Sequence, residues 1–594
     1  MLNLFQHFKR GNLDAAIVFC FALLVYLLTL SPLIYIEDSS EFITAAYTLG
    51  IPHPTGYPLY VILGKIFTFL PFGSIAEKVN LLSAVAGAGA VAVLFLLLRR
   101  LNISRLVSFV AAFTLAFSVV WWSQSVIAEV YTLHTLFGAL SLYFWQRWRE
   151  SRRIKFLYVS IGLVGLGSAN HPLLAFLLLP YCLYLFRDWF RHQINFSQLL
   201  AASGWFGLGL SVYLYLPIRV FGRADFRFNN LQGWGDIINF LNRRYYGDVG
   251  FQFNWQKISL ILDSFIKSAE MNFGITVVVL LAISVGWWYK HKRKQFWFWL
   301  LVLFSQFLPI ALLRSSGYGL DLDYNNRVYY FISFVVMLVW LAGMFDFYWQ
   351  KLKTKKVKWV GLLLLVALPS YLLLKNFSAS NRSDYCLADA YVKAMMDSLP
   401  NGAVLLMHGG GYVGDSVLFG LGYLQYVKNY RPDVTVIDNN VIFHLPPSID
   451  SGYIRSAQDK DQLFARLVEE AWNYAQNRNL PLFTTFAVER YSNLVSRSNG
   501  VLYQIFANKD QATDLPNALP YLCGQDSEFV KNDFANQDVL ANYFYNQASW
   551  YWDQGRKDKY TNLIKQAILL DNEPMGEEYL QLLSHKQIFV QPQD

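Results

Sequence analysis

The stretch LDAAIVFCFALLVYLLTLSPLIYI, residues 13–36, is followed directly by Glu37-Asp38-Ser39-Ser40-Glu41. An apolar segment of this length is sufficient to cross a hydrocarbon layer of about 30 Å as a helix. The three carboxylates that follow are costly in lipid, so we expect them to face water, protein or a substrate where the span ends. The stretch therefore predicts a membrane protein with an acidic cluster at one end of its helices.

The composition of the whole chain favours the same class. Of its 594 residues, 55% are hydrophobic and 15% are charged, whereas soluble domains carry about 25% charged residues. The apolar excess ends near residue 376. We therefore predict a mainly α protein, with a membrane helix bundle over residues 1–376, a soluble α/β domain over 377–530 and a tail resembling a tetratricopeptide hairpin over 531–594.

Basic loops set the expected orientation of the apolar segments. Eleven segments are candidate spans: 13–36, 80–98, 106–121, 128–146, 156–169, 172–186, 198–217, 271–289, 296–313, 328–347 and 359–375. Six basic clusters, each separated from the next by two spans, lie at 9–10, 99–105, 147–155, 187–192, 290–294 and 351–358. All six can face the cytoplasm together, which places the carboxylates and the C-terminal domain on the opposite side. The net charge of +9 then needs no nucleic-acid partner.

This orientation requires residues 37–79 to form one extracytoplasmic loop. Residues 57–72 are apolar, but Pro58 and Pro71 interrupt them, and the segment is short for a span. We expect an interfacial helix there. Residues 13–36 lack a small-residue cleavage site, so we expect a retained first span rather than a cleaved signal peptide.

The four cysteines divide between the two parts of the chain. Cys20 and Cys182 lie in apolar segments, and Cys386 and Cys523 lie in the soluble part. A disulfide between the second pair is one alternative, but we expect two free thiols.

The first loop holds the candidate chemistry. Residues 38–49 have helical spacing, and Asp38 and Glu41 are neighbours on the first turn. They form either a capping box or a site in which a carboxylate acts as general base on a hydroxyl. The first interpretation leaves Glu37 unexplained. His53, in the following loop, either donates hydrogen bonds to a substrate or satisfies a backbone carbonyl.

Other polar residues lie at span ends on the same predicted face. Glu129 and Tyr131 begin the fourth span, where Glu129 is either functional or a boundary residue that snorkels. His171 joins two spans and is either a site residue or an ordinary loop residue. Arg219 and Arg327 end one span and begin another. Their planar fork suits a lipid phosphate, and interfacial anchoring is the alternative.

The first-loop motifs resemble a known family. DSSEF at 38–42 and GIPHPTGYPLY at 50–60 are similar to the D-S-G-E-F and A-H-P-P-G-Y-P-L-Y motifs of a bacterial membrane family. That family is grouped with protein O-mannosyltransferase-like enzymes of the glycosyltransferase C (GT-C) superfamily. Shorter similarities include AEVY at 128–131 and NHP at 170–172, and the resemblance covers most of residues 15–440. Ser40 and Thr55 depart from the family pattern.

The resemblance implies an inverting glycosyltransferase with about eleven to thirteen spans. It would move a sugar, such as the hexose mannose, from a polyprenyl-phosphate carrier to an acceptor hydroxyl on the extracytoplasmic face. Asp38 matches the position of the family's catalytic acid, and we expect it to be the general base. The candidate substrate-binding residues are Glu37, Glu41, His53, Tyr57, Glu129, Tyr131, His171, Arg219 and Arg327.

Partners and cofactors follow from the same interpretation. The co-substrate would be a polyprenyl-phosphate sugar and the acceptor a protein or a glycolipid, with membrane lipids around the spans. No metal or organic cofactor is expected, although the carboxylates are the candidate ligands if a divalent ion is required. The expected location is a bacterial cytoplasmic membrane. The alternatives are a glycolipid-modifying transferase of the same type and a transporter, which would carry internal repeats and charges at the bilayer midplane.

Overall fold

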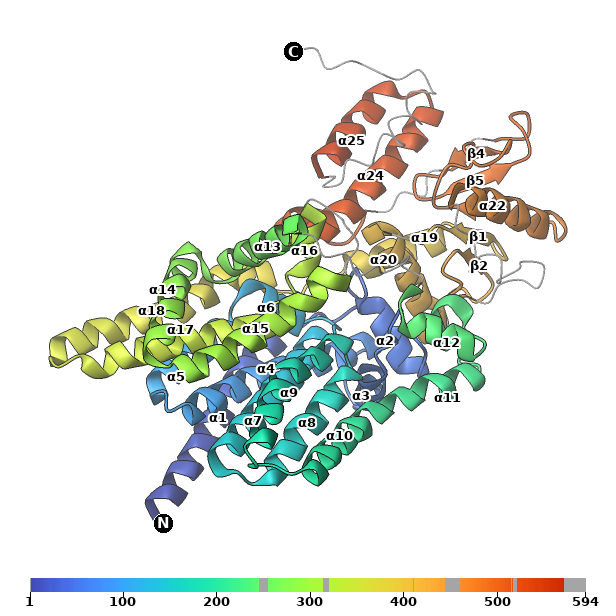
Figure 1. Ribbon diagram of the computed structural model, residues 1–594. Coiled ribbons are helices and arrows are strands. Elements are labelled where there is room, and N and C mark those ends of the chain that lie inside the picture. Colours follow the sequence, from blue (N-terminus) through green and yellow to red (C-terminus); the bar gives the residue numbers. More distant parts are fainter. Residues whose placement is uncertain are drawn as a thin grey trace. The chain divides into compact units, whose positions relative to one another are not determined.

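The computed structural model describes residues 2–244, 255–313, 320–409, 411–443, 460–513, 515–516 and 521–570. Its backbone divides into two compact units. Unit 1 comprises Met1–Leu33, Ala45–Asp225 and Leu231–Asp384, and unit 2 comprises Ile34–Thr44, Phe226–Asn230 and Tyr385–Asp594. Figure 1 traces the order of their elements along the chain.

Unit 1 is a bundle of long helices in which α1, α4, α7, α8 and α10 pack successively side by side (Figure 1). Its helices are α1 (Leu2–Leu28), α3 (Pro58–Thr68), α4 (Ile75–Arg100), α5 (Arg105–Ala116), α6 (Val119–Ser125), α7 (Tyr131–Ser151), α8 (Ile154–Ser168), α9 (Leu178–Phe190), α10 (Phe196–Leu210), α11 (Tyr215–Phe221), α12 (Trp234–Leu241), α13 (Trp255–Phe273), α14 (Ile275–His291), α15 (Arg293–Leu313), α16 (Leu320–Asn326), α17 (Phe331–Lys351) and α18 (Lys355–Ser380). Alanines and glycines on α4 allow close packing, and a Cβ added at Gly87 would lie 2.5 Å from Ser125 Oγ.

The membrane helix bundle predicted from the sequence is confirmed, but the span count is smaller by length and hydropathy alone. Among the described residues, five helices are long and apolar enough to cross a membrane, and two bent pairs would raise the number to seven. The first predicted span was too long, because α1 ends at Leu28. Pro32 follows closely, and the residues before a proline disfavour helical geometry.

The helix predicted at 57–72 is present as α3 (Pro58–Thr68), and its place at the membrane interface stays a prediction. It has 11 residues, which at about 1.5 Å per residue give roughly 16 Å, too short to cross the bilayer. It packs against α4, and a Cβ at Gly64 would lie 2.7 Å from Ala46 Cβ. Residues 57–72 therefore form no span of their own, as the loop pattern requires.

The described basic loops converge on one end of unit 1, which we call the basic end. Asp188 at the end of α9 forms ion pairs with Arg149, Arg152 and Arg187 at 2.5, 2.8 and 2.8 Å. This contact joins the basic clusters at 147–155 and 187–192. The hydroxyl of Tyr184 donates to the carbonyl oxygen of Lys294 at 3.3 Å, which adds the cluster at 290–294.

Two further ion pairs extend the basic end to the remaining helices. Arg100 pairs with Glu150, and Arg105 pairs with Asp14 of α1 at 2.6 Å. The backbone N–H of Ser104 donates to Asp346 of α17 at 2.9 Å. Four of the six basic clusters are therefore linked at one end of unit 1, and the side of the membrane that they face stays a prediction.

Unit 2 contains a five-stranded sheet in the order β2-β1-β3-β5-β4. Strand β1 runs parallel to β2 and β3, and β5 runs antiparallel to β3 and β4. The elements are α19 (Leu387–Asp397), β1 (Val404–Met407), α20 (Gly411–Gly422), β2 (Thr435–Asp438), α22 (Lys460–Gln476), β3 (Leu482–Thr484), β4 (Val495–Ser498) and β5 (Tyr503–Phe506). The predicted α/β domain is confirmed. Strand β4 was missed because its sequence VSRS contains a single apolar residue.

The predicted helical tail is also present as a hairpin of α24 (Phe534–Asp553) and α25 (Lys557–Leu570), preceded by the short α23 (Glu528–Asn532). Ala541, Tyr545 and Ala567 form the small core between the two helices. Gly555 has a φ of 71° in the turn, a conformation that suits glycine. Residues 571–594 lie outside the described part of the chain.

The cysteine prediction was wrong. Cys386 and Cys523 form a disulfide with a Cα–Cα distance of 5.7 Å. The two residues are 137 positions apart, and the sequence does not reveal that the segment before α23 returns to the start of α19. Both α19 and the α24 hairpin belong to unit 2.

Candidate functional site

The acidic first-loop residues belong to unit 2, in the segment Ile34–Thr44. The N–H of Phe42 donates to the carbonyl oxygen of Asp38 at 2.9 Å, so Asp38 lies at the start of α2 (Ser39–Thr48). The predicted helix is therefore correct to within one residue. Glu37 has a φ of 62°, which few non-glycine residues adopt. Its N–H donates to Ser416 Oγ at 2.7 Å, and this bond holds the turn that precedes Asp38.

A buried hydrogen-bond network fastens this segment to the rest of unit 2. Asn536 on α24 donates from Nδ2 to the Tyr35 hydroxyl at 2.9 Å, and Tyr385 donates from its hydroxyl to Asn536 Oδ1 at 2.7 Å. The rings of Tyr35 and Tyr385 are 4.5 Å apart. Because Asn536 is fully buried, loss of this network would leave its polar groups unsatisfied. The helical tail thus positions the segment that carries Asp38.

Asp38 and Glu41 form a close carboxylate pair. Asp38 is half-buried, Glu41 is fully buried, and a carboxylate oxygen of each lies within 4.8 Å of the other. Two carboxylates this close repel unless they share a proton or a cation. The pair can therefore hold a proton taken from a hydroxyl, and it has the oxygen chemistry to supply two ligands to a divalent ion.

A second group of predicted residues meets inside unit 1. His171 lies at the centre of what we call the His171 cluster. Its ring centroid is 5.9 Å from that of Tyr57, 5.9 Å from Tyr131, 5.3 Å from His134 and 5.8 Å from Tyr329. His53 joins the cluster, because its Nε2 lies 2.8 Å from the Tyr57 hydroxyl. Four of the residues predicted from sequence are therefore brought together.

The His171 cluster contains buried polar atoms that the described residues leave unsatisfied. His171 is 3% exposed and His134 is 7% exposed, and neither Nδ1 has a hydrogen-bond partner within the described part of the chain. Such atoms are rare in folded proteins and call for a functional or hydration role. A ligand with hydroxyl groups can supply partners to both nitrogens. The cluster thus has the chemistry of a site for a polar, neutral ligand.

Two members of the cluster were not predicted as site residues. His134 is three residues after Tyr131 on α7, so their shared helix face was a usable signal. Tyr329 lies in the turn before α17 and carries no motif that distinguishes it from other tyrosines. Its ring reaches Tyr131 at 5.6 Å.

Glu129 lies just before α7 and is 2% exposed. Its N–H donates to Ser83 Oγ at 3.0 Å, and Ser83 also bonds the Tyr60 hydroxyl at 3.0 Å. This burial against α4 does not fit a side chain that snorkels to water. Glu129 therefore sits inside the bundle wall.

The two predicted phosphate-binding arginines have different surroundings. Arg219 donates from Nε to the carbonyl oxygen of Leu49 at 2.6 Å and from Nη2 to that of Thr48 at 3.4 Å. These carbonyls lie at the C-terminal end of α2, where they lack helical partners. Arg327 stacks over the Tyr324 ring at 3.5 Å. The contacts of Arg219 indicate that it holds α2, and phosphate binding by either residue stays a prediction.

The chain is similar in sequence and in fold to known proteins. Residues 38–193 match the model of the Protein O-mannosyl-transferase TMEM260 N-terminal domain. The fold resembles that of ArnT from Cupriavidus metallidurans, with a TM-score of 0.53 at 11% identity over 84% of this chain and 98% of that one. Residues 38–193 are thus similar to a protein O-mannosyl-transferase domain, and the fold of the chain is similar to that of ArnT. The resemblance based on the first-loop motifs is therefore confirmed.

The chain is also similar to curated proteins from Mus musculus and Dictyostelium discoideum. It is 28% identical over 466 residues to Protein O-mannosyl-transferase TMEM260 of Mus musculus, covering 73% of this chain and 64% of the relative. It is 22% identical over 485 residues to Protein O-mannosyl-transferase tmem260 of Dictyostelium discoideum, covering 74% and 58%. The chain thus spans less than two thirds of the length of these relatives. Asp38 and the five predicted residues from Glu41 to Tyr131 lie within the family match, as does His171, whereas Arg219 and Arg327 lie beyond it.

Proposed function

We propose that this protein is an inverting glycosyltransferase that moves a hexose such as mannose from a polyprenyl-phosphate carrier to an acceptor hydroxyl. The observation that carries the proposal is Asp38, held at the start of α2 beside Glu41 and included in the family match. Relatives named protein O-mannosyl-transferases support the reaction class. The ArnT structure contains undecaprenyl phosphate, which supports a lipid-linked donor.

In the proposed reaction, Asp38 accepts the proton of the acceptor hydroxyl. The hydroxyl oxygen forms a bond to C1 of the sugar while the bond from C1 to the phosphate oxygen breaks. The electron pair leaves with the polyprenyl phosphate, and attack from the opposite face inverts the configuration at C1. General base catalysis of this kind contributes about 10²–10⁴-fold.

The surrounding residues have separable proposed roles. Glu37 and Glu41 hold the acidic turn and tune Asp38, and Arg219 fixes the far end of α2. His53, Tyr57, Tyr131 and His171 would hydrogen-bond or stack on sugar groups, since rings and ring nitrogens suit neutral hydroxyl-rich ligands. Arg327 remains the candidate for the donor phosphate, because arginine can bind it through two parallel hydrogen bonds.

Asp38→Asn tests the catalytic role directly. The amide keeps the shape and can still accept a hydrogen bond at the helix start, so the protein should fold while turnover falls about 10²–10⁴-fold. Turnover is measured with a labelled polyprenyl-phosphate hexose. The exposed Asp225→Asn is the matched control and should keep full activity. Turnover near the wild-type level in Asp38→Asn would show that Asp38 is not the general base.

A metal requirement is tested separately. Activity that EDTA abolishes and Mg²⁺ restores would reassign Asp38 and Glu41 as metal ligands.

We further propose that unit 2 and the acidic segment face the extracytoplasmic side. The meeting of basic loops at one end of unit 1 supports this orientation, and the Cys386–Cys523 disulfide is typical of oxidising compartments. After replacement of Cys20 and Cys182, Ser527→Cys should react with an impermeant thiol reagent in intact cells and Thr354→Cys should not. Both positions are exposed. The opposite labelling pattern would invert the orientation.

A further inference from the structure

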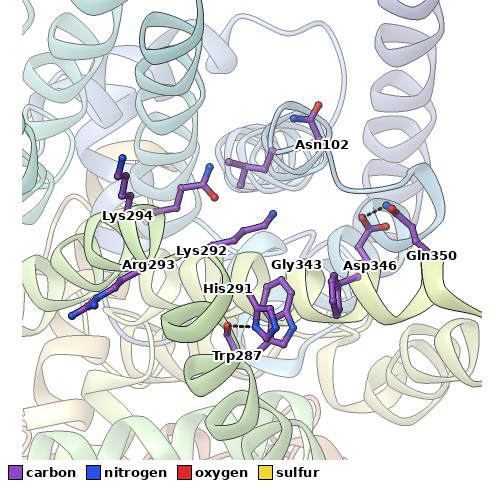
Figure 2. A pocket seen from close by; sticks show the side chains of 12 residues that line it. Asn102, Trp287, His291, Lys292, Arg293, Lys294, Gly343, Asp346 and Gln350 are labelled. Carbon is purple, nitrogen blue, oxygen red and sulfur yellow. Dashed lines mark hydrogen bonds between the residues drawn. The ribbon is translucent and has the colours of Figure 1, made fainter.

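The basic end of unit 1 contains a pocket that the proposed reaction does not use. Its volume is about 620 Å³, and it is lined by the turn between α14 and α15, the residues after α4 and the last turns of α17 (Figure 2). The side chains that matter here are Trp287, His291, Lys292, Arg293, Lys294 and Asp346. Tyr131 and Ser151 begin and end α7, so the length of this helix separates the basic end from the His171 cluster.

The cations of this pocket differ from the five arginines at the basic end that form ion pairs. Arg100, Arg105 and the three arginines around Asp188 all pair with carboxylates. In the part of the chain that the structure describes, Lys292, Arg293 and Lys294 form no ion pair. The three cations that line the pocket therefore have no carboxylate partner among the described residues.

The single carboxylate in the lining is already engaged. Asp346 is 6% exposed and accepts hydrogen bonds from the Ser104 N–H at 2.9 Å and from Gln350 Nε2 at 2.7 Å. Figure 2 shows the bond between Asp346 and Gln350. Burial lowers the pKa of Lys292, and the charge of Asp346 offsets this only in part. An anion in the pocket would stabilise the charged lysine.

A buried donor provides an independent observation. Trp287 lines the pocket and is 6% exposed, and its indole Nε1 has no acceptor within the described residues. The indole ring stacks on His291 at 4.9 Å, and the Trp287 carbonyl oxygen lies 3.0 Å from His291 Nδ1. A buried N–H without an acceptor is costly, and an oxygen-rich anion would supply one.

We propose that this pocket binds the phosphate group of an anionic membrane phospholipid. Basic pockets between membrane helices at the positively charged face are suited to such headgroups. Two large aromatic side chains beside the pocket favour a lipid over a free phosphate, since Tyr289 and Trp297 are 45% and 47% exposed on α14 and α15. Exposed aromatic rings of this kind are enriched where helices meet the lipid headgroups. The proposal is independent of the sugar-transfer reaction.

The test uses the full-length protein in detergent and native mass spectrometry with added phosphatidylglycerol or phosphatidylcholine. The first variant combines Lys292→Gln, Arg293→Gln and Lys294→Gln. The matched control combines Lys353→Gln, Lys355→Gln and Lys356→Gln, which removes the same charge from exposed positions at the same end and outside the pocket lining. A second variant, Trp287→Phe, removes the buried donor but retains an aromatic ring.

We expect the wild type to retain phosphatidylglycerol in preference to phosphatidylcholine. The pocket variant should bind phosphatidylglycerol at least about tenfold more weakly, given the contribution of each basic residue near anionic lipid, and the control should bind it normally. Trp287→Phe should weaken binding several-fold with no change in net charge. Equal losses in the pocket variant and the control would overturn the proposal, as would unchanged binding in Trp287→Phe. Inorganic phosphate that binds as tightly as the lipid would overturn the lipid assignment.

Discussion

The two ends of unit 1 are held together by different interactions. At the basic end, one buried carboxylate, Asp188, gathers three arginines, and two further ion pairs join neighbouring helices. At the other end, the His171 cluster consists of aromatic and imidazole rings with neutral hydrogen bonds. Five arginines at the basic end pair with carboxylates, and the Trp287 indole N–H at its pocket has no described acceptor, whereas the His171 cluster holds two buried ring nitrogens without described partners.

This difference separates polar groups that stabilise from polar groups that await a ligand. A carboxylate that is buried and fully paired stabilises the fold only as part of its network, because removal of one member exposes the charges of the others. An unsatisfied buried nitrogen lowers stability and is retained where it serves another purpose. Changes in the Asp188 network should therefore affect stability, and changes in the His171 cluster should affect activity.

Among changes within unit 1, the largest expected effect is that of His171→Phe on activity. The phenyl ring fills the space among the four neighbouring rings but removes both ring nitrogens. We expect turnover with a polyprenyl-phosphate hexose to fall about 10²-fold, the usual cost of losing one polar group at a reacting substrate. The melting temperature in detergent should not fall, because no described partner of Nδ1 is lost. Normal turnover in this variant would show that the His171 cluster contributes packing and takes no part in the reaction.

Asp188→Asn should give the opposite pattern. The change leaves Arg149, Arg152 and Arg187 without their shared counter-charge. Their side chains are 22%, 43% and 40% exposed, so solvent screens part of the repulsion and we expect a loss of about 2 kcal/mol in stability. Thermal unfolding in detergent measures this loss, and turnover per folded molecule should stay near that of the wild type. Reduced turnover with unchanged stability would contradict the idea that the Asp188 network serves stability and the His171 cluster serves activity.

Much of the fold followed from patterns that are local in sequence. The helix at 39–48, four of the five strands of the α/β domain and the helical hairpin of the tail were predicted from hydrophobic periodicity. The first-loop motif and the family resemblance made Asp38 and His53 candidate site residues, and their roles stay predictions. The meeting of basic loops at one end followed from charge counts, since each loop obeys the same orientation rule.

The missing parts depend on contacts between distant segments. The disulfide joins residues 137 positions apart, and the bond from Asn536 to Tyr35 joins residues 501 positions apart. No periodicity records either contact. Arg219 shows the same limit, because its position at a span end indicated a phosphate ligand. The structure adds hydrogen bonds from its side chain to the carbonyl oxygens of Leu49 and Thr48, which the sequence did not indicate, and phosphate binding stays a prediction.

The last and smallest expected effect decides between these two roles for Arg219. Lysine keeps the charge but cannot reproduce the bonds from Nε to Leu49 and from Nη2 to Thr48. If Arg219 positions α2, Arg219→Lys should lower kcat about tenfold, because a small displacement of the acidic helix misplaces Asp38, and leave the KM for the lipid-linked donor nearly unchanged. Steady-state kinetics with varied donor concentration separate the two constants. Arg327→Lys is the matched comparison and should raise the donor KM, since phosphate binding remains its predicted role. A raised donor KM with normal kcat in Arg219→Lys would show that Arg219 binds the donor phosphate. It would also show that its contacts with the end of α2 are not needed for catalysis.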